Sequence, residues 1–588
     1  MLGRGEGSGP GRRVRARRAS TRALVAIAVG ISVIAMAGMT ARAVITKSSC
    51  TNNPLIVNLA ASYDIAPTIQ AIARTFNTQH EVAASRCVEV QVTPGEPSAV
   101  AAQIDGQDSL HGMTAVDAWI PDSSLWVDVA RSYPVGAQVI QLTGISVARS
   151  PVMLVTTQQV AAETGIFSGP ASWGVLLPTS IGGPPTSDGL SVDMPDPEDS
   201  AVGLSTLIEI SRLLSTAQAA QAGFTKYVLA TEPTEDFDSV SALEQFAAST
   251  GAPFFRRTVT EASEQAVIAY DRANPRQPLI ARYPTAASKL LGSPELDYPY
   301  VVTSTNSAMA QAATAFGRFL QGGYAQAAIR YAGFRSADGL TDTMPATSGL
   351  SSQPLQVAPP PSASVAATTL ADWQKLGLGT RAIALIDDSA AMGAPSGLGS
   401  ATLEQLLTQT AARGLALFPD TAEMGLWEAP DSQSSANAYR SLVSIGPLPA
   451  QYGLITRRAQ IEEVDQTLTP TSKPLHLYDA ILAAYQQMTA TYAANYSNVV
   501  IVLTAGIDAP GDMNLTALLG KLHALVNPQR RVEIVVLQFG TVGNFTAMQE
   551  IAAATSGAAY QIVNPLEVGN VFIYAIAHTM CAEGCGGP

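Results

Sequence analysis

The chain contains 588 residues, and one hydrophobic core rarely serves so many, so we expect two or three domains. Hydrophobic residues make up 47% of it and charged residues 14%, which is typical of packed globular domains and excludes a largely disordered chain. The formal net charge of −13 is unevenly distributed, because the first 49 residues are strongly basic and the rest is strongly acidic. An acidic exterior repels phosphate backbones, so nucleic acid is not expected as a partner.

The N-terminus combines a basic tail, residues 1–22, with an uncharged apolar run from Ala23 to Ala41. The run is long enough to cross a bilayer, so 23–43 is predicted to be a single-pass transmembrane anchor. Arginines in front of it should stay in the cytoplasm, which places the bulk of the chain outside the cell membrane. A cleaved signal peptide remains the alternative, because Ala41-Arg42-Ala43 resembles an A-x-A cleavage site.

The four cysteines, Cys50, Cys87, Cys581 and Cys585, all follow the apolar run. Outside the cell such residues are expected to be oxidised, and the simplest pairing is Cys50 with Cys87 and Cys581 with Cys585. A zinc site is the rival interpretation, but the spacings do not form two close ligand pairs.

Residues 50–339 alternate short apolar strands with amphipathic helices. "PLIVNLAAS", from Pro54 to Ser62, predicts a buried strand, and "APTIQAIARTFNTQ" predicts the helix after it. The strand "CVEVQVTPG", the helix "PSAVAAQIDG" and the strand "AVDAWIP" continue the pattern. Such alternation favours a parallel α/β sheet, whose ligands lie outside the carboxyl ends of the strands.

Several segments of this first part resemble one family. "LAASYDIAPTIQAIARTFN", "DAWIPDSSLWVDVA", "SVARSPVMLV", "DPEDSAVGLSTL", "DYPYVV" and "AAIRYAGFR" are similar, in order and spacing, to the type 2 extracellular solute-binding domains of ABC-type transporters. The resemblance implies two α/β lobes, a hinge and an interlobe cleft.

The candidate ligand contacts in this part are Ser62, Asp117, Trp119, Ser150 and Ser200, at expected strand ends and helix starts. Helix N-termini suit anions, but the acids at 196, 198 and 199 would oppose an anionic ligand. The alternative is that Ser62 and Ser200 cap helices and that Asp117 and Trp119 are packing residues.

Residues 340–370 are rich in Pro, Ser, Thr and Ala and lack strand or helix periodicity, so they are predicted to form a semi-extended linker. Strands are then expected at 381–387, 422–430, 498–506 and 530–540, with helices near 402–413, 458–468, 477–494, 514–526 and 544–556. This predicts a Rossmann-like doubly wound domain over 371–580, followed by a short tail, 581–588. No G-x-G-x-x-G follows the first strand, so a dinucleotide is not expected. No other cofactor is expected either.

The motifs of this second part resemble a bacterial von Willebrand factor A (vWA) domain. The first strand leads into Asp387-Asp388-Ser389, and "MGLWEAP", "LYDAILAAY" and "VVIVLTAGID" follow in the family's order. In that family a D-x-S-x-S loop, a threonine and an aspartate bind a divalent metal, which suits the oxygen preference of Mg²⁺.

The metal pattern is damaged in this chain. Asp387 and Ser389 match the family, whereas Ala391 replaces the second serine, Leu475 the threonine and Ala505 the aspartate. We therefore expect no metal, with the two remnant residues bonded to backbone amides of their own loop.

Without a metal, direct contacts to a partner would come from groups such as Lys473 and His476, while Trp427 is expected in the core. No G-x-S-x-G, H-E-x-x-H or phosphate loop is present, so an enzyme is not expected. The sequence favours a membrane-anchored, extracytoplasmic binding or adhesion protein whose vWA-like domain binds protein. The alternative is a solute receptor of an ABC-type transporter, with a small-molecule ligand.

Overall fold

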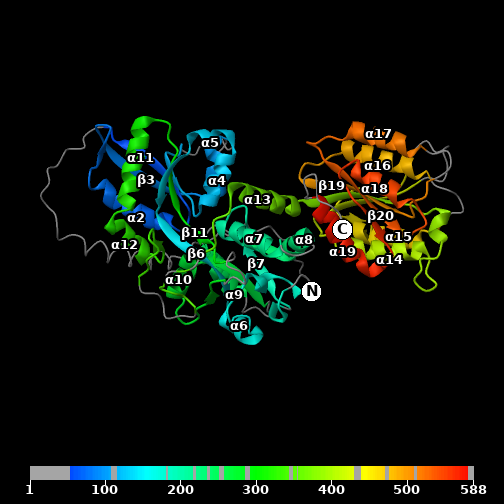
Figure 1. The fold of residues 1–588 in the computed structure, drawn as a ribbon, viewed down its shortest axis with the longest axis horizontal. Helices are drawn as coiled ribbons and strands as arrows, with labels where there is room; N and C mark the ends of the chain where they lie inside the picture. The colour runs from blue at the N-terminus through cyan, green and yellow to red at the C-terminus, as the bar shows by residue number, and fades with distance from the viewer. Residues whose placement is uncertain are drawn as a thin grey trace, which may run out of the picture.

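A computed structural model describes the chain as a pair of α/β lobes followed by a separate doubly wound sheet (Figure 1). It describes residues 53–106, 115–179, 183–187, 189–215, 220–234, 239–249, 257–284, 292–342, 349–353, 355, 357–429, 439–470, 476–508 and 513–579.

The first lobe is a sheet with the strand order β2-β3-β1-β4-β12-β5. Its strands are β1 (Leu55–Ala61), β2 (Val82–Ala83), β3 (Arg86–Pro94), β4 (Ala118–Ile120), β5 (Gln141–Ser146) and β12 (Pro299–Val302). Its helices are α2 (Ala66–Asn77), α3 (Pro97–Ile104), α4 (Ser124–Ser132), α5 (Pro134–Val139), α11 (Ser307–Leu320) and α12 (Gly323–Tyr331). β1 pairs in parallel with both β3 and β4, as the alternation of strands and helices predicts. In α2 the apolar residues at three- and four-residue spacing are buried against the sheet.

The second lobe is a sheet with the order β10-β6-β9-β7-β8, to which β11 and β13 add by pairing with β6. Its strands are β6 (Ala148–Thr156), β7 (Ser191–Pro195), β8 (Thr231–Thr234), β9 (Thr258–Ser263), β10 (Ile280–Arg282), β11 (Glu295–Leu296) and β13 (Arg335–Ser336). Its helices are α6 (Gln158–Thr164), η1 (Trp173–Leu176), η3 (Pro185–Ser187), α7 (Ala201–Leu214), α8 (Ala220–Ala230), α9 (Ser239–Ser249) and α10 (Glu264–Ala273). The chain crosses between lobes at Val147, whose N–H donates to the carbonyl of Tyr298 on the returning crossing, at 2.9 Å.

The C-terminal part is a sheet with the order β16-β15-β14-β19-β20-β21, parallel except for β16 at one edge. Its strands are β14 (Gly379–Ile386), β15 (Glu423–Glu428), β16 (Arg440–Val443), β19 (Tyr496–Thr504), β20 (Val532–Phe539) and β21 (Ala559–Ile562), and β17 (Gln451–Tyr452) and β18 (Ile455–Thr456) form a hairpin. Its helices are η4 (Ala390–Gly393), α14 (Leu403–Leu415), α15 (Arg457–Thr467), α16 (Leu477–Ala490), α17 (Leu515–Leu525), α18 (Phe545–Ala553), η5 (Pro565–Glu567) and α19 (Val568–Thr579). Helices α16, α17 and α18 cover one face, and α14, α15 and α19 the other (Figure 1). This is the doubly wound architecture that the sequence predicts.

The segment 340–370 is not a free linker, which corrects the sequence-based expectation. Its last residues belong to helix α13 (Ala363–Gly377), which Ser362 caps by accepting from the N–H of Val365. Before α13 the chain is bound along the second lobe: Ala358 donates to the carbonyl of Ser293 at 2.8 Å, and Arg212 donates to that of Pro359 at 3.3 Å. These contacts join segments far apart in the sequence, and composition does not report them.

The N-terminal predictions fall outside the described residues, because 1–52 is not among them. Among the residues that the structure does describe, no helix has both the length and the apolar character needed to cross a bilayer. Cys87, in β3, is disulfide-bonded. Cys50, Cys581 and Cys585 lie outside the described residues, so the pairing stays a prediction.

Candidate functional site

The surface where the two lobes meet is built from strand ends of the first lobe and the N-terminus of α7 in the second. Asp122 follows β4, and its Oδ2 accepts from the backbone N–H of Ala201, the first residue of α7, at 3.2 Å. A helix N-terminus presents free N–H groups and a partial positive charge, so a carboxylate stabilises it. The chain therefore fills with its own side chain the place at which such a helix would bind an anion.

The environment of Asp122 opposes its negative charge. Burial raises its pKa to about 8, and the charge of Asp64 adds to the effect, while the hydrogen bond from Ala201 opposes it. Asp64 itself accepts a hydrogen bond from the hydroxyl of Tyr298, a residue that is fully buried. Two carboxyl groups of the first lobe thus lie close enough to interact, and one of them, Asp122, contacts the start of α7.

A second set of acids lies across the same interlobe surface. Ser98, in the first turn of α3, donates to Asp199 of the other lobe at 3.3 Å and also donates to Glu96. Burial, a hydrogen bond with Asp199 and the charges of Asp199 and Asp196 together raise the pKa of Glu96 to about 7. Acids of both lobes therefore face one another, and a group that donates hydrogen bonds or carries positive charge would relieve their repulsion.

Helix α13 bridges the two lobes. Its Ala366 and Leu370 join a cluster with Leu125 of α4, in the first lobe, and with Leu204 and Ile208 of α7, in the second. Figure 1 shows α13 between the lobes and the C-terminal sheet, and β14 begins directly after it. The same helix thus contacts both lobes and leads into the first strand of the C-terminal part.

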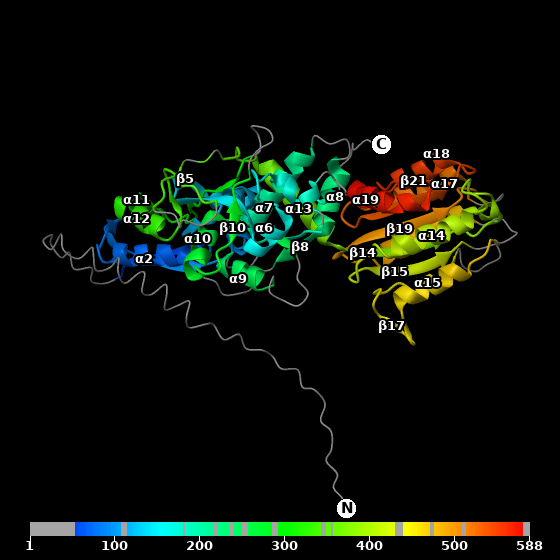
Figure 2. The ribbon, with the colours of Figure 1, turned by 90° about the horizontal axis from the view of Figure 1, so that it is seen from below.

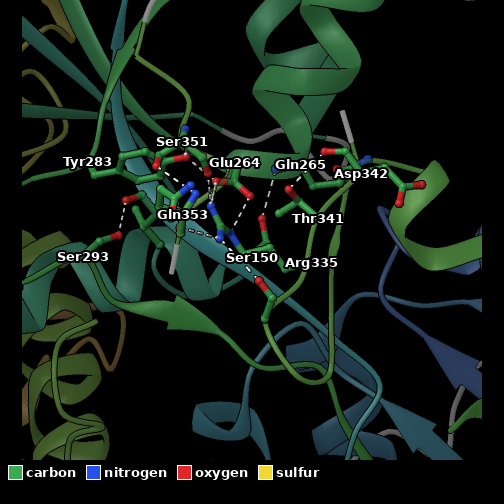
Figure 3. Close-up of polar contacts among 12 residues, drawn as sticks. Ser150, Glu264, Gln265, Tyr283, Ser293, Arg335, Thr341, Asp342, Ser351 and Gln353 are labelled. Carbon is green, nitrogen blue, oxygen red and sulfur yellow. Dashed lines mark hydrogen bonds and ion pairs between the residues drawn. The ribbon is translucent and has the colours of Figure 1, made fainter. Parts of the chain in front are cut away.

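Arg335 and Glu264 form a buried ion pair in the second lobe (Figure 3). Arg335 Nε and Nη2 donate to the two oxygens of Glu264 at 2.9 and 2.8 Å, and the guanidinium also donates to the carbonyls of Ser351 and Gln353, at 2.6 and 3.2 Å. The hydroxyl of Tyr283 accepts from the N–H of Ser351 at 3.1 Å and donates to Glu264. The network joins the segment after β13 to the start of α10, so its role is to hold the chain that leads to α13.

The candidate ligand contacts that the sequence suggests in the two-lobed part lie apart from one another in the structure. Asp117 precedes β4, at the end of that strand away from Asp122, and accepts from the N–H of Asn58 at 3.1 Å. Trp119 is fully buried in the core. Ser62 does not cap α2, which begins after Ile65, but bonds to the carbonyl of Ile120.

The remaining serines act at helix starts. Ser200 caps α7 through the N–H of Val202 at 3.2 Å, as the capping alternative predicts. Ser150 is fully buried in β6, and its Oγ accepts from the N–H of Gln265 at 3.0 Å, next to the Arg335 network (Figure 3).

Asp122 and Glu96 are the interlobe acids that sequence reasoning missed. Asp122 lies in "IPDSS", where the serine that follows it caps α4, so the motif reads as an ordinary helix start. Glu96 directly precedes the proline that begins α3. An acid placed just after a strand end and before a helix is the signal that could have indicated them.

In the C-terminal part, Asp387 is bonded to its own loop and to the end of β19, whereas Ser389 Oγ is buried without a hydrogen-bond partner in the part of the chain that the structure describes. Asp387 Oδ1 accepts from the N–H of Ser389 at 2.9 Å, and its Oδ2 from Thr504 Oγ1 at 2.5 Å and from the N–H of Ala505 at 3.2 Å. Ala391 and Ala505 offer no side-chain oxygen, and the described residues contain no cluster of His, Cys, Asp and Glu placed to hold a metal ion. The residues present do not fit the family's metal site.

Next to this loop, the carboxyl group of Asp388 is buried against Glu428. Burial raises the pKa of Asp388 to about 8, and the hydrogen bond and charge of Glu428 contribute. Glu428 in turn forms an ion pair with Arg440 on the edge strand β16. The loop therefore carries less negative charge at neutral pH than its sequence suggests.

The other candidates of this part are buried or lie outside the described residues. Trp427 packs in the core and stacks on Tyr439 with 3.6 Å between ring centroids, which agrees with the expectation of core packing. His476 is buried at the start of α16. Lys473 and Leu475 lie outside the described residues.

Comparison with known proteins gives the following matches. Residues 57–335 match the family model described as bacterial extracellular solute-binding protein. Two curated relatives, uncharacterized proteins of Mycobacterium tuberculosis strains CDC 1551 / Oshkosh and H37Rv, are each 25% identical over 548 residues, or 87% of this chain and 75% of theirs.

Two solved structures are each similar to a part of the chain. The sulfate-binding protein SubI from Mycobacterium tuberculosis H37Rv is 18% identical, covers 48% of this chain and 87% of its own, and has a TM-score of 0.34. A von Willebrand factor type A structure from Catenulispora acidiphila is 16% identical, covers 34% of this chain and 43% of its own, and has a TM-score of 0.28.

Proposed function

We propose that the chain is a non-enzymatic, extracytoplasmic receptor whose two-lobed part captures a small solute that donates hydrogen bonds or carries positive charge. The family match over residues 57–335 supports a solute-binding domain. The anchor predicted at 23–43 would hold the receptor at the cell membrane, where its solute could pass to an ABC-type transporter.

The observation that carries the solute class is the acidic interlobe surface. Glu96 of the first lobe faces Asp196 and Asp199 of the second, and Asp122 already occupies the N-terminus of α7. An anionic solute would have to displace the carboxyl group of Asp122 and approach Glu96, Asp196 and Asp199, which costs Coulomb energy at short range. A cation or a polyol donates to these oxygens instead.

The test is a thermal-shift titration of the full-length protein at pH 7.5 with putrescine, arginine, choline, a disaccharide, sulfate and phosphate. We expect a saturable rise in Tm with a cationic or polyol solute and none with the two anions. The double variant Glu96→Gln/Asp199→Asn should weaken the binding of the cation, whereas Glu81→Gln, an exposed acid beside the edge strand β2, should not. A saturable rise with sulfate or phosphate would contradict the proposed solute class.

We further propose that the vWA-like part contacts a protein partner, because its β17–β18 hairpin projects from the domain (Figure 2). Leu454 at the tip is fully exposed, and Tyr452 is 55% exposed. Apolar side chains on a projecting turn are suited to insertion into a partner.

A photo-crosslinking residue at Leu454 in living cells should capture a defined protein, while the same residue at Val542, which is 58% exposed, should not. Equal capture at both positions would count against the hairpin.

A further inference from the structure

The two faces of the C-terminal sheet are packed unequally. On the face covered by α16, α17 and α18, Val500 and Val502 of β19 and Ile534 and Val536 of β20 are fully buried. On the opposite face, Ile501 of β19 and Leu537 of β20 are only partly buried, although these strands lie in the middle of the sheet. Apolar side chains at the centre of a sheet are normally close-packed, so this second face is underpacked.

A cavity of about 300 Å³ occupies that face. Its lining is mostly apolar and comes from β14, β15, β19 and β20 on one side and from α14, α15 and α19 on the other. Along β14 it reaches from Thr380 to Ile386, which corresponds to about 20 Å of strand. The volume is that of a small-molecule pocket, and the mostly apolar lining suits an apolar guest.

Polar groups accompany the cavity at defined places. Lys375, near the end of α13, lines it five residues before Thr380, together with Leu229 of α8. This end lies at the junction with the second lobe, where Lys226 of α8 donates to Asn570 of α19 at 3.0 Å. Asp465 of α15 also lines the cavity, and its Oδ1 is buried without a hydrogen-bond partner in the part of the chain that the structure describes. A cation at one end and a buried carboxyl along an apolar channel fit an amphiphile rather than a plain hydrocarbon.

We propose that the C-terminal part binds a free, single-chain fatty acid, with the alkyl chain along β14 and β19 in this cavity and the carboxylate beside Lys375. The chain would cover Ile501 and Leu537 and remove their exposed apolar surface from water. The carboxylate would lie at the junction of the domains, where the charge of Lys375 complements it. This site is separate from the interlobe surface and does not depend on the solute bound there.

The binding test uses the full-length protein held in an amphipathic polymer, with radiolabelled palmitate in equilibrium dialysis. We expect saturable binding of palmitate, weaker binding of hexadecanol, which lacks the charge, and much weaker binding of octanoate, which leaves most of the channel empty. In Lys375→Met the preference for palmitate over hexadecanol should disappear. No saturable palmitate binding, or equal binding of octanoate, would overturn the proposal.

A cavity-filling variant separates binding in this site from partition into the polymer. Ala384 faces the cavity from β14, between Leu426 and Ile501 on the neighbouring strands. Ala384→Leu should raise the Tm of the ligand-free protein and weaken palmitate binding by at least about tenfold. The matched variant is Ala480→Leu in α16, where the alanine is fully buried on the close-packed face. It should lower the Tm by overpacking and leave the palmitate affinity unchanged.

Two results would count against the assignment. Undiminished palmitate binding in Ala384→Leu would place the fatty acid elsewhere. If phosphatidylglycerol displaces the labelled palmitate from the polymer-held wild type more strongly than unlabelled palmitate does, the chain in the cavity comes from a membrane lipid and the free-acid assignment is wrong.

Discussion

The carboxylate of Asp122 accepts a hydrogen bond at 3.2 Å from the backbone N–H of Ala201, and these two residues belong to different lobes. The contact gives a partner to an N–H at the start of α7 and joins the lobes at the surface where a solute is expected to bind. Its strength depends on pH, because burial and the charge of Asp64 raise the pKa of Asp122 to about 8.

Stability is predicted to fall as pH rises from about 4 to about 8. A carboxyl group whose folded pKa is raised binds more protons in the folded than in the unfolded chain over that window, so deprotonation favours unfolding. Asp122 follows this rule with a folded pKa of about 8 and an ordinary value of 3.8. The pKa values of Glu96, Glu404 and Asp465 are each raised to about 7, so these acids change the stability in the same direction. Thermal unfolding of the full chain at pH 5.5 and 8 should show the higher Tm at pH 5.5.

Asp122→Asn should reduce this pH dependence, because the amide keeps the shape of the side chain and does not titrate. Asp105→Asn is the matched control, because Asp105 follows α3 in the same lobe and is only half-buried; it should leave the dependence unchanged. A wild type that is more stable at pH 8 than at pH 5.5 would contradict the assigned direction.

Disrupting α13 should release the lobes from each other and from the C-terminal part. In Ala366→Asp a charge enters the cluster with Leu125 and Leu204, and burying an unpaired charge is unfavourable, so the helix should detach. Small-angle scattering of the full chain should then give a larger radius of gyration. Val365→Asp is the matched control, because Val365 is the preceding residue of the same helix and is 40% exposed. Equal radii for the two variants would show that α13 does not hold the parts together.

Removing Arg335 is predicted to cost about 3 kcal/mol of the free energy of unfolding, because Glu264 loses its ion pair while remaining buried. The Arg335→Met protein should show this loss in urea denaturation, and Arg335→Met/Glu264→Leu should recover part of it. The surface pair of Arg330 and Asp342 offers the comparison: Arg330→Met should cost less than about 1 kcal/mol. A similar cost for both single variants would mean that the buried network does not hold the segment after β13.

Millimolar magnesium is predicted to leave the Tm of the full chain unchanged. Both oxygens of Asp387 already accept hydrogen bonds, from Ser389, Thr504 and Ala505. Of the family's other ligand positions only Ser389 keeps a side-chain oxygen, because alanine or leucine stands at 391, 475 and 505. A hard divalent cation needs several oxygen ligands in near-octahedral geometry, which this loop does not supply. A saturable rise in Tm with magnesium, absent in Asp387→Asn, would show that the site still binds the ion.

The sequence by itself determined the local structure of both parts. Apolar runs such as Val499–Leu503 and the burial stripe of α2 follow from periodicity, because a side chain's position along a strand or helix fixes the face on which it lies. In the loop after β14 the expected bond of Asp387 to a backbone amide of its own loop is confirmed, at the N–H of Ser389. The expected bond of the Ser389 side chain is not, because its Oγ is buried without a hydrogen-bond partner among the described residues. Trp427 was correctly expected in the core.

Only the tertiary structure decided the site and the connection between the parts. Asp122 and Ala201 are 79 residues apart, and no periodic pattern relates two residues that meet only when the lobes close. The segment 340–370 reads as a linker because its composition is that of a loop, yet Arg335 binds its carbonyls and Ala366 and Leu370 pack on both lobes. A spacing of four residues marks one face of a helix, but it does not say what that face will contact. Burial on such a face depends on partners supplied by distant segments, and the folded arrangement alone specifies them.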